Sequence, residues 1–140
     1  MNTKKVIIYV DGASRGNPGP AAIAVIVQDE MGKAVASFSR CIGTTTNNEA
    51  EYRAIIAALQ KAVSLGAREV TLKSDSELVV KQLNGRYRVK ASTLKPLYQQ
   101  VQKLQSFLGR LTITHIPRTA NRKADSLANK ALNLVSNHGA

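Results

Sequence analysis

Apolar residues in this chain form two kinds of run, and the first kind is typical of strands. Residues 6–10 and 21–28 are almost unbroken apolar stretches rich in valine, isoleucine and alanine, as in strands covered on both faces. Residues 33–42, 69–74 and 111–116 predict three further strands. Short links join the first three strands, so we expect an antiparallel meander at the amino-terminal end of the domain.

The second kind of run repeats at helical spacing. Such repeats lie between a capping segment at 43–48 and Gly66, over 76–83, over 94–108, and after Asn121. The first of these helices connects the third strand to the fourth, so the fourth strand should run parallel to the first. The pattern predicts an α/β fold: a mixed five-stranded sheet with helices on its faces. At 140 residues we expect one domain over 1–140, with a frayed tail over 136–140.

Four carboxylates stand at the boundaries of the predicted elements. Asp11 follows the first strand directly and precedes nine residues with three glycines and two prolines, and Asp75 ends the fourth strand. Glu51 and Asp125 lie in the first turns of two helices. Each acid has a simpler explanation, since aspartate caps turns and carboxylates favour helix starts. Clustered carboxylates repel one another unless cations lie between them, and oxygen ligands suit Mg²⁺ or Mn²⁺.

The charge balance indicates a polyanionic partner. Twenty Lys and Arg residues face nine Asp and Glu residues, for a net charge of +11, and from residue 78 onward eleven basic residues accompany one acid. No basic amphipathic helix with bulky aromatic residues supports a membrane partner. With no signal peptide or apolar membrane span, we expect a cytoplasmic protein. The lone Cys41 is predicted to be a small core residue of a strand.

Four motifs in order resemble type 1 ribonuclease H over essentially the whole chain. They are DGASRGNPGP at 11–20, TNNEAEY at 46–52, SDSELVV at 74–80 and NRKADSLANKAL at 121–132. The resemblance implies strand order 3-2-1-4-5 and endonucleolytic cleavage of the RNA strand of RNA/DNA hybrids, leaving 5′-phosphate and 3′-hydroxyl ends. It implies two divalent ions, Mg²⁺ or Mn²⁺, held by four carboxylates: Asp11, Glu51, Asp75 and Asp125. Glu49 competes in its motif, but the family's glutamate stands three residues after the second asparagine, which selects Glu51.

The same resemblance implies contacts with the RNA strand along its minor groove, where the 2′-hydroxyl distinguishes RNA from DNA. For the two asparagines of the second motif, helix capping is the alternative role. Glu77 stands where many relatives have glutamine. The implied contact residues are Gly12, Ala13, Ser14, Arg15, Asn17, Asn47, Asn48 and Glu77.

Two features depart from the family pattern. The long basic protrusion of many members is replaced by the short basic segment 84–92. The flexible-loop histidine of many members is absent, and Arg118 is the candidate for that place, acting electrostatically because arginine does not titrate near neutral pH. His115 lies inside the predicted fifth strand, where we expect it to be packed or hydrogen-bonded.

Other functions stay open on the sequence alone. They are a nuclease of the same fold that also acts on double-stranded RNA or on a DNA junction, and a catalytically silent nucleic-acid-binding module. Retention of four carboxylates in a basic protein argues against the silent module. We expect a monomer.

Overall fold

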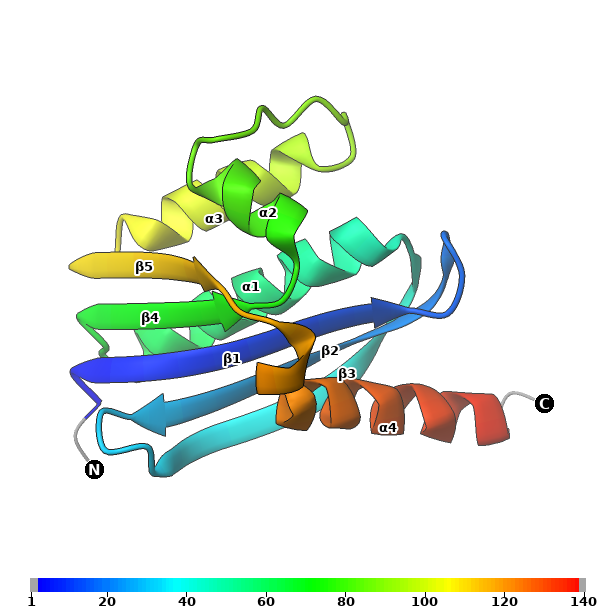
Figure 1. Cartoon of the computed structure of the whole chain (residues 1–140), viewed down its shortest axis with the longest axis horizontal. Coiled ribbons are helices and arrows are strands. Elements are labelled where there is room, and N and C mark those ends of the chain that lie inside the picture. Colours follow the sequence, from blue (N-terminus) through cyan, green and yellow to red (C-terminus); the bar gives the residue numbers. More distant parts are fainter. Residues whose placement is uncertain (1–2, 139–140) are drawn as a thin grey trace.

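The computed structural model describes residues 3–138 and shows the predicted alternation of strands and helices (Figure 1). In chain order the elements are β1 (Lys5–Ser14), β2 (Gly19–Asp29), β3 (Ala34–Thr45), α1 (Asn47–Ser64), β4 (Glu69–Ser74), α2 (Glu77–Leu83), α3 (Lys95–Gln105), β5 (Arg110–His115), the 3₁₀ turn η1 (Arg118–Ala120) and α4 (Arg122–His138). Within this part of the chain, no helix is long and apolar enough to cross a membrane.

The five strands form one mixed sheet in the order β3-β2-β1-β4-β5, which confirms the predicted order. The pairs β1–β2 and β2–β3 are antiparallel, whereas β1–β4 and β4–β5 are parallel. β1 is therefore the central strand, and its apolar side chains Val6, Ile8 and Val10 are at most 2% exposed. The long run of β-branched residues suits this position, since both faces of a central strand are covered.

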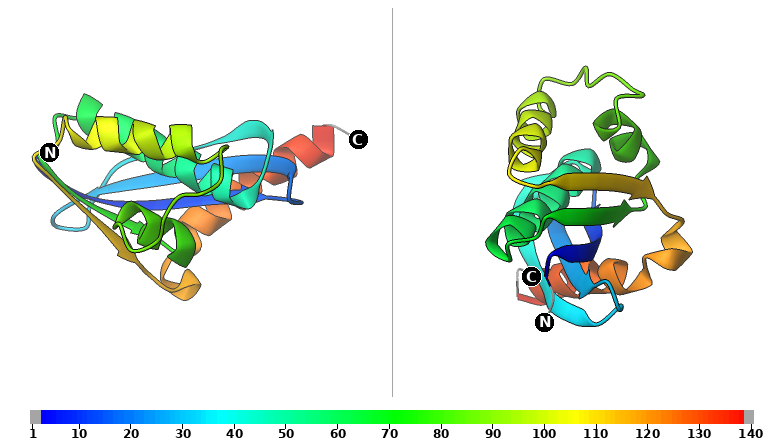
Figure 2. Two further views of the ribbon diagram at one scale, coloured as in Figure 1. Left: turned by 90° about the horizontal axis from the view of Figure 1, so that it is seen from above. Right: turned by 90° about the vertical axis from the view of Figure 1, so that its left-hand side faces the viewer.

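Helices cover the two faces of the sheet unequally (Figure 2). α1 packs on β1 and β2 from one side, with α3 against α1, and the α1 residues Ile55 and Leu59 join the main core. α4 packs on the other side, where Ala124 and Ala128 meet Ala24 and Ile26. The small residues of α4 let this helix approach the sheet closely, so the start of α4 lies near the centre of the sheet.

Three details differ from the sequence prediction. β1 does not stop before Asp11 but continues to Ser14, because residues 12–14 pair with β2. Cys41 is exposed rather than a core residue, because it lies on the edge strand β3, although its thiol donates to the Ala131 carbonyl (3.2 Å). His115 is exposed rather than packed, because it is the last residue of β5.

The carboxyl-terminal tail is tested only in part. α4 continues to His138, but the side chains from 135 onward and residues 139–140 lie outside the described part of the chain. The frayed tail expected over 136–140 stays a prediction.

Candidate active site

The parallel register of β1 and β4 brings two aspartates together. Tyr9 pairs with Lys73 at the end of this ladder, and two residues later each segment carries its aspartate, Asp11 and Asp75. Ligand sites in open sheets lie at such carboxyl ends of parallel strands. Because Asp11 lies inside β1, the alternative that it caps a turn does not fit the structure.

A close approach of α1 to β1 adds the glutamate. Thr46 caps α1 by accepting from the Glu49 amide (3.3 Å), which fixes the start of the helix. A Cβ on Gly12 would stand 2.3 Å from the Ala50 carbonyl carbon and 2.4 Å from the Glu51 nitrogen. Only glycine fits at that distance, so Gly12 allows the helix to set Glu51 beside Asp11. Glu49, the competing acid, instead accepts from the Thr45 hydroxyl at the helix start.

The three carboxylates form a compact group that could hold a metal ion. One oxygen from each of Asp11, Glu51 and Asp75 lies within 4.8 Å of the other two. Asp11 is 4% exposed and Glu51 is 3% exposed, yet Asp11 Oδ2 and Glu51 Oε2 are buried without a hydrogen-bond partner in the described residues. Buried charge without a partner is costly. Unpartnered, converging carboxylate oxygens are what a hard divalent cation requires, so the residues present fit such an ion.

Burial and mutual repulsion perturb the acids strongly. Burial first, and then the charges of Asp75 and Asp125, raise the pKa of Asp11 from 3.8 to about 7, while Arg118 opposes the change. Burial, Asp11 and Asp75 raise the pKa of Glu51 well above its ordinary 4.5. A proton shared between the Asp11 and Glu51 carboxyls would partly relieve this repulsion. A divalent ion would replace that proton.

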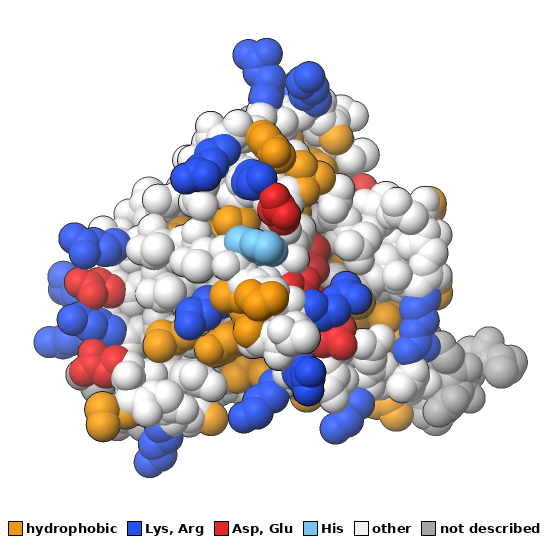
Figure 3. All heavy atoms as spheres, in the orientation of Figure 1, with side chains coloured by type: hydrophobic (Ala, Val, Ile, Leu, Met, Phe, Trp, Pro, Cys, Tyr) orange, Lys and Arg blue, Asp and Glu red, His pale blue; other side chains and the backbone are white. Residues whose placement is uncertain are grey.

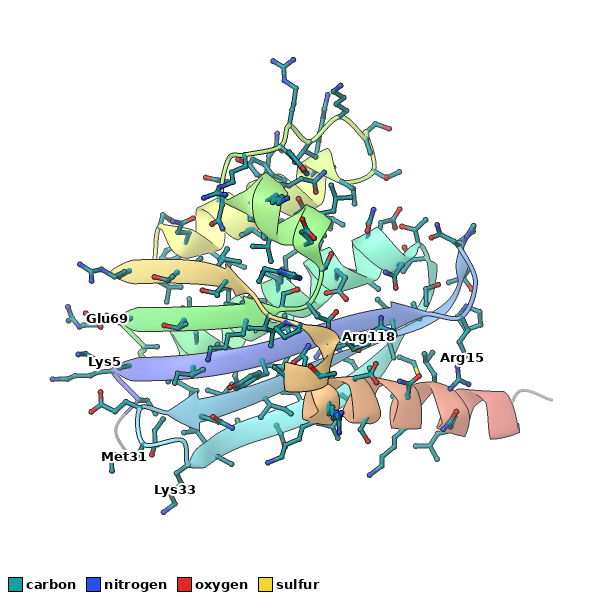
Figure 4. All side chains as sticks on the ribbon, viewed as in Figure 1. Lys5, Arg15, Met31, Lys33, Glu69 and Arg118 are labelled. Atoms are coloured by element: carbon teal, nitrogen blue, oxygen red, sulfur yellow. The ribbon has the colours of Figure 1, made fainter. Side chains whose placement is uncertain are left out.

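Asp125 and Arg118 border the same cavity, which has a volume of about 370 Å³. Asp125 is half-buried in the first turn of α4, and the Asn129 amide one turn later donates to its carboxylate (3.3 Å). Arg118 is exposed on η1, directly after Pro117 ends the β5 segment, and Figure 4 labels it beside η1 and β1. The cavity thus combines four carboxylates with one guanidinium.

Asn121 is a residue of this region whose contacts the sequence did not reveal. Asn121 directly precedes α4, where asparagine commonly caps a helix, and its backbone carbonyl accepts from the Asp125 amide (3.1 Å). Its side chain, however, is 1% exposed and donates to Asp75 Oδ2 (2.9 Å) and to the Val10 carbonyl (2.8 Å). Asn121 therefore holds Asp75 against β1. The only available signal was its place at the start of the fourth motif.

The residues expected to contact substrate lie around the cavity in two groups. Gly12, Ala13, Ser14 and Asn47 line it directly, together with Ser76 and Asn129, which sequence reasoning missed. Four others lie outside its lining: Arg15, whose guanidinium donates to Asn133 of α4; Asn17, which accepts from the Asn47 amide (3.1 Å); Asn48 in the first turn of α1; and Glu77, paired with Lys81 (2.6 Å).

Cations surround this acidic centre. Figure 3 shows Lys and Arg side chains spread over the face that carries η1 and α4, with acidic side chains between them. The α2–α3 connection adds Arg86, Arg88 and Lys90, and Tyr87 lies under the Lys81 ammonium (5.0 Å to the ring centroid). A phosphate backbone is attracted to such a surface, whereas the carboxylates repel it unless cations neutralise them.

Comparison with known proteins gives one consistent result. Residues 9–131 match the family model described as reverse transcriptase-like. The RNase H1 structure from Halobacterium salinarum is 43% identical, with a TM-score of 0.90 over 92% of this chain and 98% of that one. The amino-terminal RNase H domain of Rv2228c from Mycobacterium tuberculosis is 44% identical, with a TM-score of 0.93 over 97% and 99%. LC11-RNase H1, solved in complex with an RNA/DNA hybrid, is 42% identical, with a TM-score of 0.89 over 93% and 98%.

Some curated relatives are longer than this chain. It spans 38% of the bifunctional mycobacterial protein Rv2228c, at 45% identity over 137 residues, and 64% of the Halobacterium ribonuclease HI, at 44% identity over 128 residues. The fold and the near-complete matches at more than 40% identity lead to one assignment. The chain belongs to the type 1 ribonuclease H family.

Proposed function

We propose that this protein is a divalent-metal-dependent endonuclease that hydrolyses the RNA strand of RNA/DNA hybrids and leaves 5′-phosphate and 3′-hydroxyl ends. The observation that carries the proposal is the convergence of Asp11, Glu51 and Asp75 with two buried, unpartnered oxygens. The hybrid bound to the related LC11-RNase H1 supports the choice of substrate.

In this proposal the four carboxylates hold two ions, either Mg²⁺ or Mn²⁺. Such a pair supplies an activated water and stabilises the leaving oxygen of a phosphodiester. Asp11 lies at the centre of the group, with Glu51 and Asp75 beside it, and Asp125 completes the set from α4. Asn121 fixes the orientation of Asp75, as outer hydrogen bonds do for metal ligands. Arg118 offers a permanent positive charge to the scissile phosphate or the leaving group.

The cavity wall is suited to reading the RNA strand. Residues 12–14 and Asn47 line the cavity that the carboxylates border. The Asn17–Asn47 hydrogen bond joins the β1–β2 loop to the start of α1, so both segments are held at one side of the cavity. A 2′-hydroxyl can both donate and accept there, which deoxyribose cannot do.

The test is a substrate panel with mapped ends. Labelled hybrid, double-stranded RNA and duplex DNA are each incubated with the protein, with Mg²⁺ and with excess chelator. We expect cleavage of the hybrid's RNA strand only when the metal is present. Cleavage in excess chelator would contradict the metal requirement, efficient cleavage of double-stranded RNA would widen the substrate class, and tight binding without any cleavage would favour the silent module.

A further inference from the structure

A second cavity, of about 240 Å³, lies on the α4 side of the sheet. Tyr9, Ile26 and Gln28 of β1 and β2 form its floor, and residues 119–124 of η1 and the first turn of α4 form its wall. No residue lines both this cavity and the carboxylate cavity. Apart from Asn121, whose amide nitrogen donates to Asp75, the residues of this cavity have no role in the hydrolysis proposed above.

The floor combines an aromatic ring, an aliphatic side chain and an amide. Tyr9 is half-buried, and the Lys73 ammonium lies 5.4 Å from the centroid of its ring. Ile26 is 7% exposed, and Gln28 adds an amide that can both donate and accept. Ring and aliphatic surfaces accept the flat face of a nucleobase, and an amide can pair with its edge.

The wall supplies positive charge. Arg122 and Lys123 are exposed in the first turn of α4, and no carboxylate is among the residues that line the cavity. A helix start carries free amide groups and a partial positive charge, which add to these two cations. A phosphate at the mouth of the cavity would therefore be attracted from the same side.

A buried acceptor at the same place points independently to a ligand. Asn121 lines the cavity and is 1% exposed, and its Oδ1 is buried without a partner in the described residues while its amide nitrogen is fully used. A buried acceptor without a donor is costly. The exocyclic amine of a base or a ribose hydroxyl would provide the missing donor once a small shift of the cavity wall uncovers this oxygen, which is shielded from solvent in the unbound protein.

We propose that this cavity binds a single nucleotide, with its base against Tyr9 and Ile26 and its phosphate beside Arg122 and Lys123. Its volume of about 240 Å³ lies below the range of about 300–1,000 Å³ for drug-sized ligands, so the cavity would enclose the base while the phosphate stays at its mouth. The occupant is either a free mononucleotide or the unpaired end of a single strand. A fully paired hybrid offers no free base, so this site is separate from hybrid cleavage.

Binding is measured by amide chemical shifts of the ¹⁵N-labelled protein in chelator without added metal, which keeps phosphate from bridging to the carboxylates. The probes are 5′-AMP, adenosine, inorganic phosphate and a single-stranded DNA pentanucleotide. We expect 5′-AMP to shift the amides of 119–124, Tyr9 and Gln28 saturably, with adenosine and phosphate each binding about tenfold more weakly or worse. Tighter binding of the pentanucleotide than of 5′-AMP supports a strand end, and binding of 5′-AMP alone supports a free nucleotide.

Three variants make the test specific. Tyr9→Leu keeps an apolar floor but removes the ring, and should weaken 5′-AMP about fivefold or more, as loss of base stacking does. Lys123→Ala should weaken 5′-AMP about threefold but leave adenosine unchanged, and it cannot be dismissed as unfolded because the side chain is exposed. Lys130→Ala, exposed on the same helix but outside the cavity, is the matched control and should change nothing.

Absence of saturable shifts at the cavity would overturn the proposal. Equal affinity of wild type, Tyr9→Leu and Lys123→Ala for 5′-AMP would also overturn it, as would amide shifts confined to residues that line the carboxylate cavity. Because no metal is present and no cleavage is measured, failure here leaves the hydrolase proposal untouched, and the converse also holds.

Discussion

Replacing Asp11 with asparagine should inactivate the enzyme and yet stabilise the metal-free protein. Asp11 is buried among Glu51, Asp75 and Asp125, and its pKa rises from 3.8 to about 7. The folded state therefore holds the Asp11 proton more tightly than the unfolded state does. Its contribution to stability is fully present below about pH 4 and is lost as the pH rises towards 7.

The size of this effect follows from the same pKa. The rise of the Asp11 pKa from 3.8 to about 7 corresponds to roughly 4 kcal/mol lost from the free energy of unfolding between acid and neutral pH. The asparagine side chain of the variant would carry no charge but would bury an amide with incomplete hydrogen bonding, at a cost of about 1–3 kcal/mol. We expect a net gain of about 1–3 kcal/mol at pH 8 in chelator, and no gain near pH 4.5, where Asp11 is already protonated.

The assay is urea unfolding of wild type and Asp11→Asn in chelator at pH 4.5, 6 and 8. Asp29→Asn is the matched control, because Asp29 is also buried, at 8% exposure, but accepts from the Met31 and Lys33 amides (both 2.9 Å) in the β2–β3 turn. Asparagine can accept the same bonds, so this variant should show no gain at pH 8. An Asp11→Asn protein less stable than wild type at pH 8, or one with the same pH slope, would refute the repulsion argument.

Four further predictions follow from individual contacts. Gly12→Ala should cost about 1–3 kcal/mol or more, measured by thermal unfolding, because its Cβ would stand 2.3 Å from Ala50 backbone atoms. A Cβ on Gly85 meets no atom within 4 Å, so Gly85→Ala carries only the strain of its positive φ of 78°, about 1–2 kcal/mol, and a smaller loss in Gly12→Ala would contradict the close-approach argument. Asn121→Ala should lower Mg²⁺ affinity about 10–100-fold, measured calorimetrically, because Asp75 loses its orienting bond, and unchanged affinity would exclude that role. Arg118→Ala should lower kcat about 10–100-fold with little change in hybrid affinity, and a loss of hybrid affinity instead would show that this role is wrong. His115→Ala should leave the melting temperature unchanged because His115 is exposed, and a clearly lower melting temperature would contradict this. Mg²⁺ affinity should rise between pH 6 and 8.5 with proton release, because Glu51 and Asp11 have raised pKa values, and a pH-independent affinity would contradict this.

The sequence predicted the strands and helices well wherever local apolar spacing decides the structure. The run at 6–10 could be read as a buried central strand, and residues 69–74 as a strand with the observed bounds. The continuation of β1 through Ser14 could not be read, because glycine and serine there are held by pairing with Ala21 and Ile23 of β2. Pairing across the sheet is a tertiary effect that propensity does not contain.

The exposed side chains show the same limit. His115 shares a strand face with Leu111 and Ile113, which suggests a covered face, and Cys41 is itself an apolar residue beside Ile42 in a predicted strand. Cys41 belongs to the edge strand and His115 to the last position of β5, so coverage ends at these residues. An alternating pattern predicts which face a residue shares, but not how far the helices extend over it.

At the candidate site, the sequence indicated the acids but not how they are held. Asp11 and Asp75 could be expected together from the ends of two parallel strands. The 2.3 Å limit at Gly12 and the bond from Asn121 to Asp75 depend on the packing of α1 and α4, which motifs alone do not describe. The close approach at Gly12 and the hydrogen bond from Asn121 explain why these two residues accompany the acids in their motifs.

The central claim is that the carboxylate group around Asp11 carries out metal-dependent cleavage of RNA in a hybrid. The most direct measurement is cleavage of one 5′-labelled hybrid by wild type and Asp11→Asn across a Mg²⁺ titration, with hybrid affinity measured alongside. We predict Mg²⁺-dependent cleavage by wild type, and a loss of more than about 100-fold in the variant with hybrid binding largely retained. Cleavage by Asp11→Asn at a rate close to that of wild type would contradict the account.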